Sequence, residues 1–483
     1  MIRWLVRLHR WLGIALCLLV ATWFATGSVL SFVPFPSLPA AERIAAGAPI
    51  DASQLRVDPV SAALAAGGDA VLRLRLVSPD GSARYVADLA DGTPVAIDAV
   101  TGRRLAMQDA AVARRVATTF TGSSVQYIDG PLLLDQWTVH DGYRAASPYY
   151  RIALDDAAGT EVYVSARTAE VAQRTVRRER AWNYAGAVVH WINLVALRQN
   201  HELWRRVVWV LAAGGIVLAL AGLALGWQRF ATWRRMGRGG MSPFRGWQRR
   251  HHLLGLFAGL LMLSWVGSGW LSLDDGRFFS SDRPDAATLA TYHGLGVVEA
   301  ARAFPLAKLQ SLTNFRELEI TAVGGRAVLI LRGASPAENQ LFQVGPGGEL
   351  RSATNLETKL LSNAVATGWA PAHIRSSARI GYDDAYNLRI NPLPPDAIRF
   401  ILDDADSTWV QVDAASGEII AVLDRSRRVH RWLVDGLHNF DFPWLNRAAP
   451  LWHILLLVGT TSGFLLAASG VVLGFRRLRG RRS

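Results

Sequence analysis

The segment "RLHRWLGIALCLLVATWFATGSVLSF", residues 7–32, decides the fold of this chain. Its last 22 residues carry no charge, and His9 stands between arginines just before them. Because a helix rises about 1.5 Å per residue, such a run crosses a hydrocarbon layer of about 30 Å. Three further uncharged runs of similar length are 207–227, 253–273 and 454–474. The sequence therefore predicts four transmembrane helices.

The net charge of +13 is concentrated beside these helices. Residues 1–10, 228–250 and 475–483 hold three, seven and five arginines and no acidic residue, so the rest of the chain is close to neutral. Positively charged loops normally face the cytoplasm. We therefore expect a multi-pass protein of the bacterial inner membrane, with both termini in the cytoplasm, two long periplasmic segments and membrane lipid around the helices. The charge does not indicate a nucleic-acid partner.

A cleaved signal peptide is the alternative interpretation of the first apolar run, because "SLPA" at 37–40 follows it. The run is longer than the apolar part of a usual signal peptide, which favours a retained helix. The only cysteine, Cys17, lies inside this helix, so no disulfide can form within the chain. We expect Cys17 to have a packing role.

The chain is internally duplicated. A shift of 248 residues aligns "YYRIALDDAAGTEVYVSARTAEV" at 149–171 with "AIRFILDDADSTWVQVDAASGEI" at 397–419, and His190 with His438. A shift of 242 aligns four residues of the first apolar segment with four of the third, namely His9 with His251, Gly13 with Gly255, Trp23 with Trp265, and Gly27 with Gly269. Each half therefore consists of a helix, an extramembrane domain and a returning helix.

The extramembrane segments have the pattern of α+β domains. Apolar and polar residues alternate between turn-forming pairs at 83–106 and 398–423, which predicts β-hairpins. Alanine-rich stretches at 61–77 and 285–302 predict helices. The fold class is thus a four-transmembrane-helix bundle with two duplicated α+β periplasmic domains.

These patterns divide the chain into eight segments. In order, they are the cytoplasmic end and first transmembrane helix (1–32), the first periplasmic domain (33–180), an interfacial helix with the second transmembrane helix (181–227), a basic cytoplasmic loop (228–250), the third transmembrane helix (251–273), the second periplasmic domain (274–426), an interfacial helix with the fourth transmembrane helix (427–475), and a basic cytoplasmic tail (476–483).

Three features of the sequence together resemble one known family. They are "LHRWLG" followed by "TG" in the first helix, the hairpins "IDAVTGRRL" (97–105) and "VDAASGEII" (412–420), and the closing "LVDGLHNFDFPWLNRAAPLWHILLL" (433–457). Over nearly the whole chain they are similar to the PepSY-associated transmembrane (PepSY_TM) family. Its members include iron-regulated inner-membrane proteins and di-haem reductases that release iron from siderophores in the periplasm, and some relatives are fused to flavin reductase modules. The resemblance implies PepSY-like periplasmic domains and electron transfer.

Four histidines fit that implied chemistry. A haem iron in an electron carrier takes two strong axial ligands, and imidazoles from facing helices supply them. We expect His9 and His251 to hold one haem b at the cytoplasmic face, and His190 and His438 to hold a second at the periplasmic face. Short amphipathic helices at 181–197 and 429–440 would place the outer pair at the membrane surface. The alternative is that histidines beside arginines are ordinary interfacial residues.

Other residues keep less specific interpretations. We expect four further histidines to be reserve ligands or to contact haem propionates or substrate, namely His252, His430, His201 and His453. The repeat favours His251 over His252 as the ligand. His140, His293 and His373 fit structural roles. Trp23 and Trp265 pack either between the haems or simply in the core.

The expected function is a haem-containing reductase without separate catalytic residues. It would pass electrons from an unidentified donor, a quinol or a cytoplasmic flavoprotein, to a ferric siderophore or another periplasmic ferric complex. The first alternative is a membrane-anchored PepSY protein that binds or inhibits a periplasmic partner. The second, a transporter, is disfavoured because the apolar runs contain no ionisable acid or base. The sequence has no GxSxG, HExxH, P-loop or dinucleotide-binding motif in a convincing context, which disfavours hydrolases and nucleotide-driven proteins.

Overall fold

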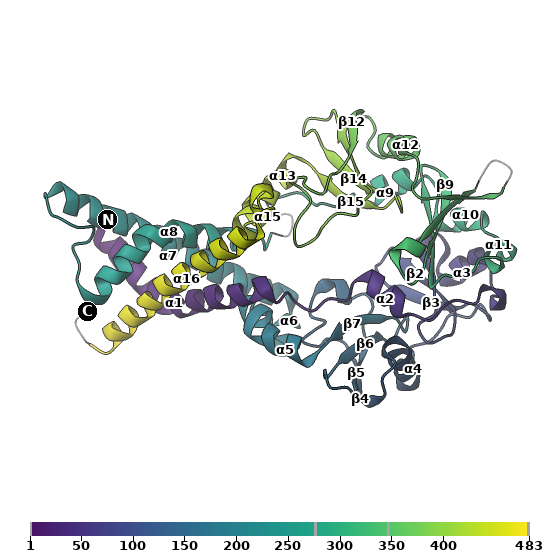
Figure 1. Ribbon diagram of the computed structural model, residues 1–483, viewed down its shortest axis with the longest axis horizontal. Coiled ribbons are helices and arrows are strands. Elements are labelled where there is room, and N and C mark those ends of the chain that lie inside the picture. Colours follow the sequence, from purple (N-terminus) through teal and green to yellow (C-terminus); the bar gives the residue numbers. More distant parts are fainter. Residues whose placement is uncertain (1, 275–277, 345–347, 481–483) are drawn as a thin grey trace.

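Four long helices form one end of the molecule (Figure 1). The computed structural model describes residues 2–274, 278–344 and 348–480. The four helices that are long and apolar enough to cross a membrane are α1 (Ile2–Phe32), α7 (His201–Arg235), α8 (Gly246–Leu271) and α16 (Ala449–Leu478). The predicted membrane-spanning bundle is confirmed. Most of these helices extend beyond the uncharged runs, because arginine is itself a good helix former.

The bundle has a defined order of neighbours. Helix α1 packs against α7 and α16, and α8 packs against the same two helices. The related helices α1 and α8 therefore lie on one diagonal of the bundle. Its centre is filled mainly by Val20, Phe24, Met262, Trp265 and Leu466. Side chains from both diagonal helices thus meet in the middle.

Beyond the bundle, the described residues form three antiparallel sheets, and the largest is farthest from the helices (Figure 1). Its strand order is β11-β10-β9-β8-β1-β2-β3. The strands are β1 (Val71–Val77), β2 (Arg84–Leu89), β3 (Pro94–Asp98), β8 (Glu317–Val323), β9 (Arg326–Arg332), β10 (Gln340–Val344) and β11 (Leu350–Ala353). Strand β1 pairs with β8, so both halves of the chain share this sheet. The sequence did not predict this union, in which each half covers an edge strand of the other.

Each half also has its own four-stranded sheet. The strands are β4 (Val125–Leu132), β5 (Tyr149–Leu154), β6 (Glu161–Ser165), β7 (Val171–Thr175), β12 (Ile374–Arg379), β13 (Ala397–Leu402), β14 (Trp409–Asp413) and β15 (Ile419–Leu423). Helix α4 (Ala110–Thr121) covers the first sheet and α12 (Thr358–Gly368) the second. The predicted hairpins and α+β class are confirmed.

One sequence prediction is wrong in part. Residues 61–77 were expected to be helical, but α3 (Pro59–Ala66) ends early and the segment "VLRLRLV" is strand β1. Its leucines and arginines alternate with period two, so Leu74 and Leu76 are buried against helices. The other stretch, 285–302, is helical, with α9 (Ala286–His293) and α10 (Val297–Arg302). The remaining short domain helices are α2 (Ala40–Ala46) and α11 (Leu306–Gln310).

Both domains return to the membrane through broken helices. In the first half these are α5 (Arg177–Asn183), the π-helical turn η4 (Tyr184–Val188) and α6 (Val195–Arg198). In the second half they are α13 (Arg425–Arg431), the π-helical turn η6 (Trp432–Gly436), α14 (Leu437–Asn439) and α15 (Pro443–Asn446). The expected short helices are present. The π-helical turns, which often occur at functional sites, were not predicted.

Candidate functional site: two histidine pairs

At the end of the bundle remote from the sheets, His9 of α1 and His251 of α8 face each other. Their ring centroids are 6.2 Å apart, and the ring planes are inclined by 43°. The two rings come from the diagonal helices and therefore meet inside the bundle. The structure brings this predicted pair together.

A second pair lies at the other end of the bundle. His190 follows the π-helical turn η4 by two residues, and His438 stands in α14 directly after η6. Their ring centroids are 6.3 Å apart, and the ring planes are inclined by 58°. The structure therefore brings this predicted pair together as well. As in the first pair, one histidine comes from each half of the chain.

Glycines lie against the histidine rings. A Cβ atom placed on Gly27 or Gly269 would come within 3.0 Å of Cε1 of His190 or His438, respectively. A Cβ on Gly222 would come within 2.7 Å of Cε1 of His9. The fourth equivalent, Gly470, lies against Cys17, with Cε1 of His251 at 3.6 Å from the added Cβ. Three of the rings thus occupy space that any residue larger than glycine would need, whereas a Cβ on Gly470 would meet Sγ of Cys17 at 2.6 Å.

Hydrogen bonds fix the orientation of all four rings. Three Nδ1 atoms lie near backbone carbonyls: His9 near Leu218 (3.2 Å), His190 near Trp23 (3.1 Å) and His438 near Trp265 (3.2 Å). A carbonyl only accepts, so the neutral ring carries its proton on Nδ1 and keeps a lone pair on Nε2. Among the described residues, no hydrogen bond engages Nε2 of any of the four. This is the tautomer in which histidine binds a metal.

A hydroxyl group favours the same tautomer in the fourth ring, that of His251. Ser469 donates its proton to the carbonyl of Leu466 (2.6 Å), so its oxygen is available to accept from Nδ1 of His251 at 2.8 Å. Ser268 and Thr26 stand in similar positions beside Nδ1 of His438 and His190. Sequence reasoning missed these hydroxyl residues, because their role depends on which helices are neighbours.

The ring spacing has a chemical meaning. A metal–imidazole bond is about 2.0 Å, and the ring centroid lies about 1.1 Å behind the nitrogen, so two imidazoles on opposite sides of one metal have centroids about 6.2 Å apart. Both observed separations, 6.2 and 6.3 Å, match this value. In the described part of the chain, no cluster of three or more histidine, cysteine or acidic residues could hold a metal. Two imidazoles at this spacing could hold a metal whose remaining ligands come from a cofactor, as in haem.

The reserve ligands lie elsewhere. His252 is buried and bonds to Ser242 (3.0 Å) and the carbonyl of Gly226 (2.9 Å), so it holds the loop between α7 and α8. The rings of the other three contact aromatic residues outside the pairs: His201 lies beside Trp204, His430 beside Phe279, and His453 beside Phe32. The histidines expected to be structural lie in the domains or against them, with His140 against Phe35, His293 against Tyr292, and His373 near Asp403.

Trp265 belongs to the surroundings of the outer pair. Its indole nitrogen donates to the carbonyl of His438 at 2.8 Å, and its ring packs edge-on against Phe24 at 5.5 Å. Trp23 packs against the same core, and its carbonyl faces Nδ1 of His190. Both tryptophans therefore fill the core and support the histidines.

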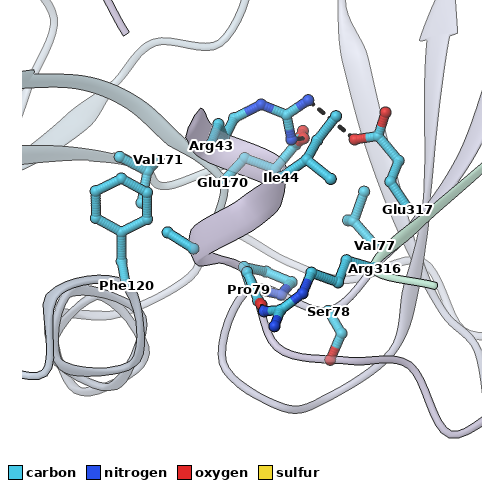
Figure 2. A pocket seen from close by; sticks show the side chains of 12 residues that line it. Arg43, Ile44, Val77, Ser78, Pro79, Phe120, Glu170, Val171, Arg316 and Glu317 are labelled. Carbon is cyan, nitrogen blue, oxygen red and sulfur yellow. Dashed lines mark hydrogen bonds and ion pairs between the residues drawn. The ribbon is translucent and has the colours of Figure 1, made fainter. Parts of the chain in front are cut away.

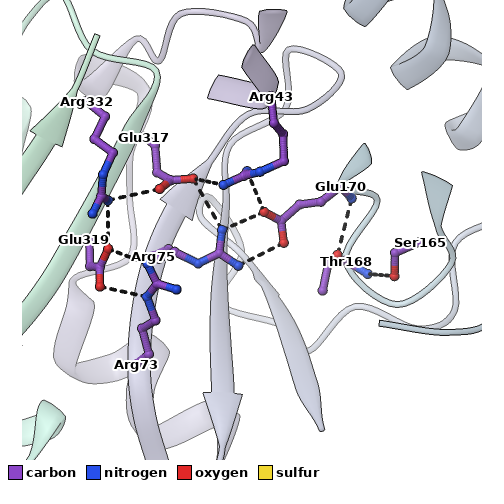
Figure 3. Close-up of polar contacts among 9 residues, drawn as sticks. All are labelled: Arg43, Arg73, Arg75, Ser165, Thr168, Glu170, Glu317, Glu319 and Arg332. Atoms are coloured by element: carbon purple, nitrogen blue, oxygen red, sulfur yellow. Dashed lines mark hydrogen bonds and ion pairs between the residues drawn. The ribbon is translucent and has the colours of Figure 1, made fainter. Parts of the chain in front are cut away.

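The domains contain a largely buried charged cluster on the shared sheet (Figure 3). Its members are Arg43, Arg73, Arg75, Arg332, Glu170, Glu317 and Glu319. Arg75 holds both oxygens of Glu170, at 2.6 and 3.1 Å, and so ties β1 to the loop between β6 and β7. A cavity of about 30 Å³ beside it is lined by Arg43, Phe120 and Arg316 among others (Figure 2). That volume accommodates about one water molecule, so the cluster is a structural junction.

The charges in this cluster control the ionisation of its carboxylates. Burial alone would raise the pKa of Glu170, but the positive charges of Arg75 and Arg43 outweigh burial and hold the pKa at about 2. The pKa of Glu319 is likewise about 2, because Arg73 and Arg332 outweigh its burial. Both groups are therefore ionised at neutral pH.

The fold and the site together define a class: a duplicated four-helix membrane protein with a two-histidine site at each end of the bundle and α+β domains on one side. The family model for the PepSY-associated TM region matches residues 6–311, and the chain belongs to this family. The matched range includes His9, His190 and His251, whereas His438 lies beyond it. Comparison with curated proteins gives no significant match.

Proposed function

We propose that this protein is a di-haem reductase of the bacterial inner membrane that carries electrons to ferric iron in the periplasm, bound to a siderophore. The observation that carries the proposal is the spacing of the two histidine pairs, with centroids 6.2 and 6.3 Å apart. Two imidazoles at this distance could hold one haem iron between them. In this proposal His9 and His251 hold the inner haem, and His190 and His438 the outer one.

The chain's own groups would set the properties of these sites. A bound haem b supplies a one-electron Fe(III)/Fe(II) couple. The carbonyls of Leu218, Trp23 and Trp265 orient three of the rings and make their Nε2 atoms more basic. Apolar side chains between the pairs exclude water.

The positions of the pairs suit passage across the membrane. His9 and Gly27 lie 18 residues apart on α1, and Gly27 contacts His190. At about 1.5 Å per residue this separation is about 27 Å, close to the thickness of the hydrocarbon layer. The basic segments beside the inner pair support a cytoplasmic location for that end and a periplasmic location for the domains.

Reduction would release the iron. Ferric iron is a harder cation than ferrous iron and binds the oxygen-rich chelators of siderophores more tightly. One electron delivered to the chelate therefore weakens its hold on the metal. The electron would come from a quinol in the membrane or from a cytoplasmic flavoprotein.

The test is a count of bound haem in protein purified in mild detergent. We expect a reduced-minus-oxidised spectrum of b type and two haems per chain. His9→Ala and His251→Ala each remove the inner haem, whereas His190→Ala and His438→Ala each remove the outer one. The matched control is His252→Ala, which removes a neighbouring buried histidine outside the pairs and leaves two haems in place.

A colourless preparation from cells supplied with haem would contradict the proposal. It would favour the alternative, a membrane-anchored protein whose domains bind or inhibit a periplasmic partner. For a coloured preparation, the pre-reduced protein is mixed with a ferric trihydroxamate and a ferrous trap. We expect haem reoxidation with formation of the trapped ferrous complex, and a lack of both would exclude this substrate class.

A further inference from the structure

An arginine stacks on a tryptophan where α16 begins. The ring of Trp452 is only 2% exposed, and its indole nitrogen donates to the carbonyl of Asn439 at 3.1 Å. The guanidinium of Arg389 lies 3.5 Å from the centroid of this ring. The backbone N–H of Arg389 donates to Asp441 at 3.0 Å, which holds the 381–393 loop against the linker.

The first half has the same arrangement with a different arginine. Trp204 is the equivalent of Trp452, and its indole nitrogen donates to the carbonyl of Trp191 at 3.0 Å. Here the stacked cation is Arg198, 4.2 Å from the ring centroid and 3% exposed. Arg198 donates twice to the carbonyl of Val139, at 2.6 and 3.2 Å. Its hydrogen-bonding capacity is used within the protein.

Arg389 differs because it is exposed. In the part of the chain that the structure describes, its guanidinium has neither a hydrogen bond nor an ion pair. The neighbouring carboxylates are already engaged: Asp441 with Arg431, Asp383 with Arg447, and Asp384 with Arg399. Trp452 covers one face of the planar guanidinium, and the five N–H donors, which lie in its plane, are therefore free at its edge.

The site stands at the level of lipid headgroups. Trp452 precedes the uncharged run 454–474 by two residues, which is about 3 Å along a helix. Exposed apolar side chains continue from the site along α16, at Leu451, Ile454 and Leu455. Exposed Tyr382, Ile390 and Trp444 lie on the same loop and linker. Aromatic residues of this kind collect at the membrane–water interface.

We propose that Arg389, stacked on Trp452, binds the phosphate of an anionic phospholipid in the leaflet next to the domains. A guanidinium pairs with a phosphodiester through parallel charge-assisted hydrogen bonds. The acyl chains then lie along the exposed apolar face of α16, and the net negative charge of the lipid balances the unpaired cation. The site belongs to the second half alone, and it does not depend on the proposed haem chemistry.

The test uses the full-length protein in nanodiscs of phosphatidylcholine with phosphatidylglycerol as the minor component. Native mass spectrometry of the released protein counts the phosphatidylglycerol that stays bound. We expect one tightly held molecule on the wild type and about tenfold weaker retention on Arg389→Gln, since charge-assisted hydrogen bonds are lost. The control is Arg375→Gln, which should keep the lipid. Arg375 is an exposed arginine of β12, an edge strand of the second half's own sheet that lies away from the bundle (Figure 1).

Two results would overturn the proposal. One is equal retention of phosphatidylglycerol by the wild type and Arg389→Gln. The other is displacement of the lipid by inorganic phosphate as readily as by short-chain phosphatidylglycerol, which would mark a site for soluble anions. Arg389→Met keeps an apolar side chain over Trp452 and no charge, so it replaces Arg389→Gln if that variant does not fold. Retention of the lipid by Arg389→Met would equally contradict the proposal.

Discussion

Each histidine ring is positioned by its own half of the chain and paired with a ring from the other half. His190 lies against Gly27 and His438 against Gly269, and these contacts are equivalent under the duplication. The glycines therefore set how far each ring moves towards the bundle axis. A methyl group at either position competes directly with an imidazole.

The substitution Gly269→Ala should displace His438 and remove the outer haem. The new Cβ would stand 3.0 Å from Cε1 of the ring, closer than carbon atoms normally approach. We expect a fall from two haems per chain to one, measured by pyridine haemochrome assay. The control Gly267→Ala, two residues earlier on α8, adds a Cβ with no atom within 4 Å and should keep both haems.

A second prediction concerns Ser469, whose oxygen faces Nδ1 of His251 at 2.8 Å. When this oxygen accepts a hydrogen bond from Nδ1–H, the imidazole gains negative character, which would stabilise ferric over ferrous iron in the proposed haem. The substitution Ser469→Ala should therefore raise the midpoint potential of one of the two haems, measured by redox titration. Ser462→Ala, which removes a half-buried serine of the same helix that bonds the carbonyl of Val458, is the control. Unchanged potentials in Ser469→Ala would show that this hydrogen bond does not tune the site.

The repeat, together with the family resemblance, predicted which histidines form pairs. A shift of 242 residues selects His251 over His252, and the structure places His251 opposite His9. The glycines at Gly27 and Gly269 were visible in the same alignment, but their contact with His190 and His438 was not. That contact depends on how the linkers fold back over the helix ends, which local sequence does not encode.

At the scale of elements, the charged cluster joins parts that are far apart in the sequence. Arg43 of α2 and Arg75 of β1 hold Glu170, which lies between β6 and β7. Glu170 and Glu418 occupy equivalent positions under the 248-residue shift, yet Glu418 is exposed. The cluster thus anchors only the first four-stranded sheet to the shared sheet.

This asymmetry predicts an acid-sensitive junction. The pKa of Glu170, about 2 in the folded protein, lies below its unfolded value of about 4.3, so its stabilisation is complete above about pH 4.3 and is lost as the pH falls towards 2. Removing one partner of a buried ion pair costs about 3 kcal/mol. We expect Glu170→Gln to lower the midpoint temperature of thermal unfolding at pH 7. As the pH falls, this midpoint should decrease less steeply in Glu170→Gln than in the wild type.

The matched control for this experiment is Glu418→Gln, which should keep both the midpoint and the acid profile of the wild type. Thermal unfolding is followed by tryptophan fluorescence in detergent between pH 3 and 7. An acid profile of Glu170→Gln identical to that of the wild type would rule out the junction as the source of the acid sensitivity.

Local sequence explains some elements better than others. Alternation in "VLRLRLV" contains the signal for β1, but the alanines before it suggested a helix through residue 77. The pairing of β1 with β8 joins residues 240 to 246 positions apart, and no local pattern specifies such a contact. The π-helical turns before His190 and His438 likewise depend on packing against α1 and α8.

At the scale of the whole molecule, duplication gives one chain the two-sided symmetry that a dimer has. The two halves contact each other at both histidine pairs and in the shared sheet. These contacts join the halves at both ends of the molecule (Figure 1). Hydropathy and repeats predicted this plan, because helix length and self-similarity are properties of the linear sequence. The pairing of β1 with β8, by contrast, depends on how the folded surfaces of the two domains fit together, and the linear sequence does not show this.

The proposed direction of electron flow can be tested on this whole assembly. Proteoliposomes that contain the protein are loaded with a membrane-impermeant reductant, and a ferric trihydroxamate with a ferrous trap is placed outside. Protein molecules whose domains face outwards should reduce the external iron, because the inner pair meets the reductant and the outer pair meets the chelate. His9→Ala should stop this reaction although its domains and outer pair are intact, whereas His252→Ala should leave it running. Equal rates with wild type and His9→Ala would show that electrons do not pass through the inner site.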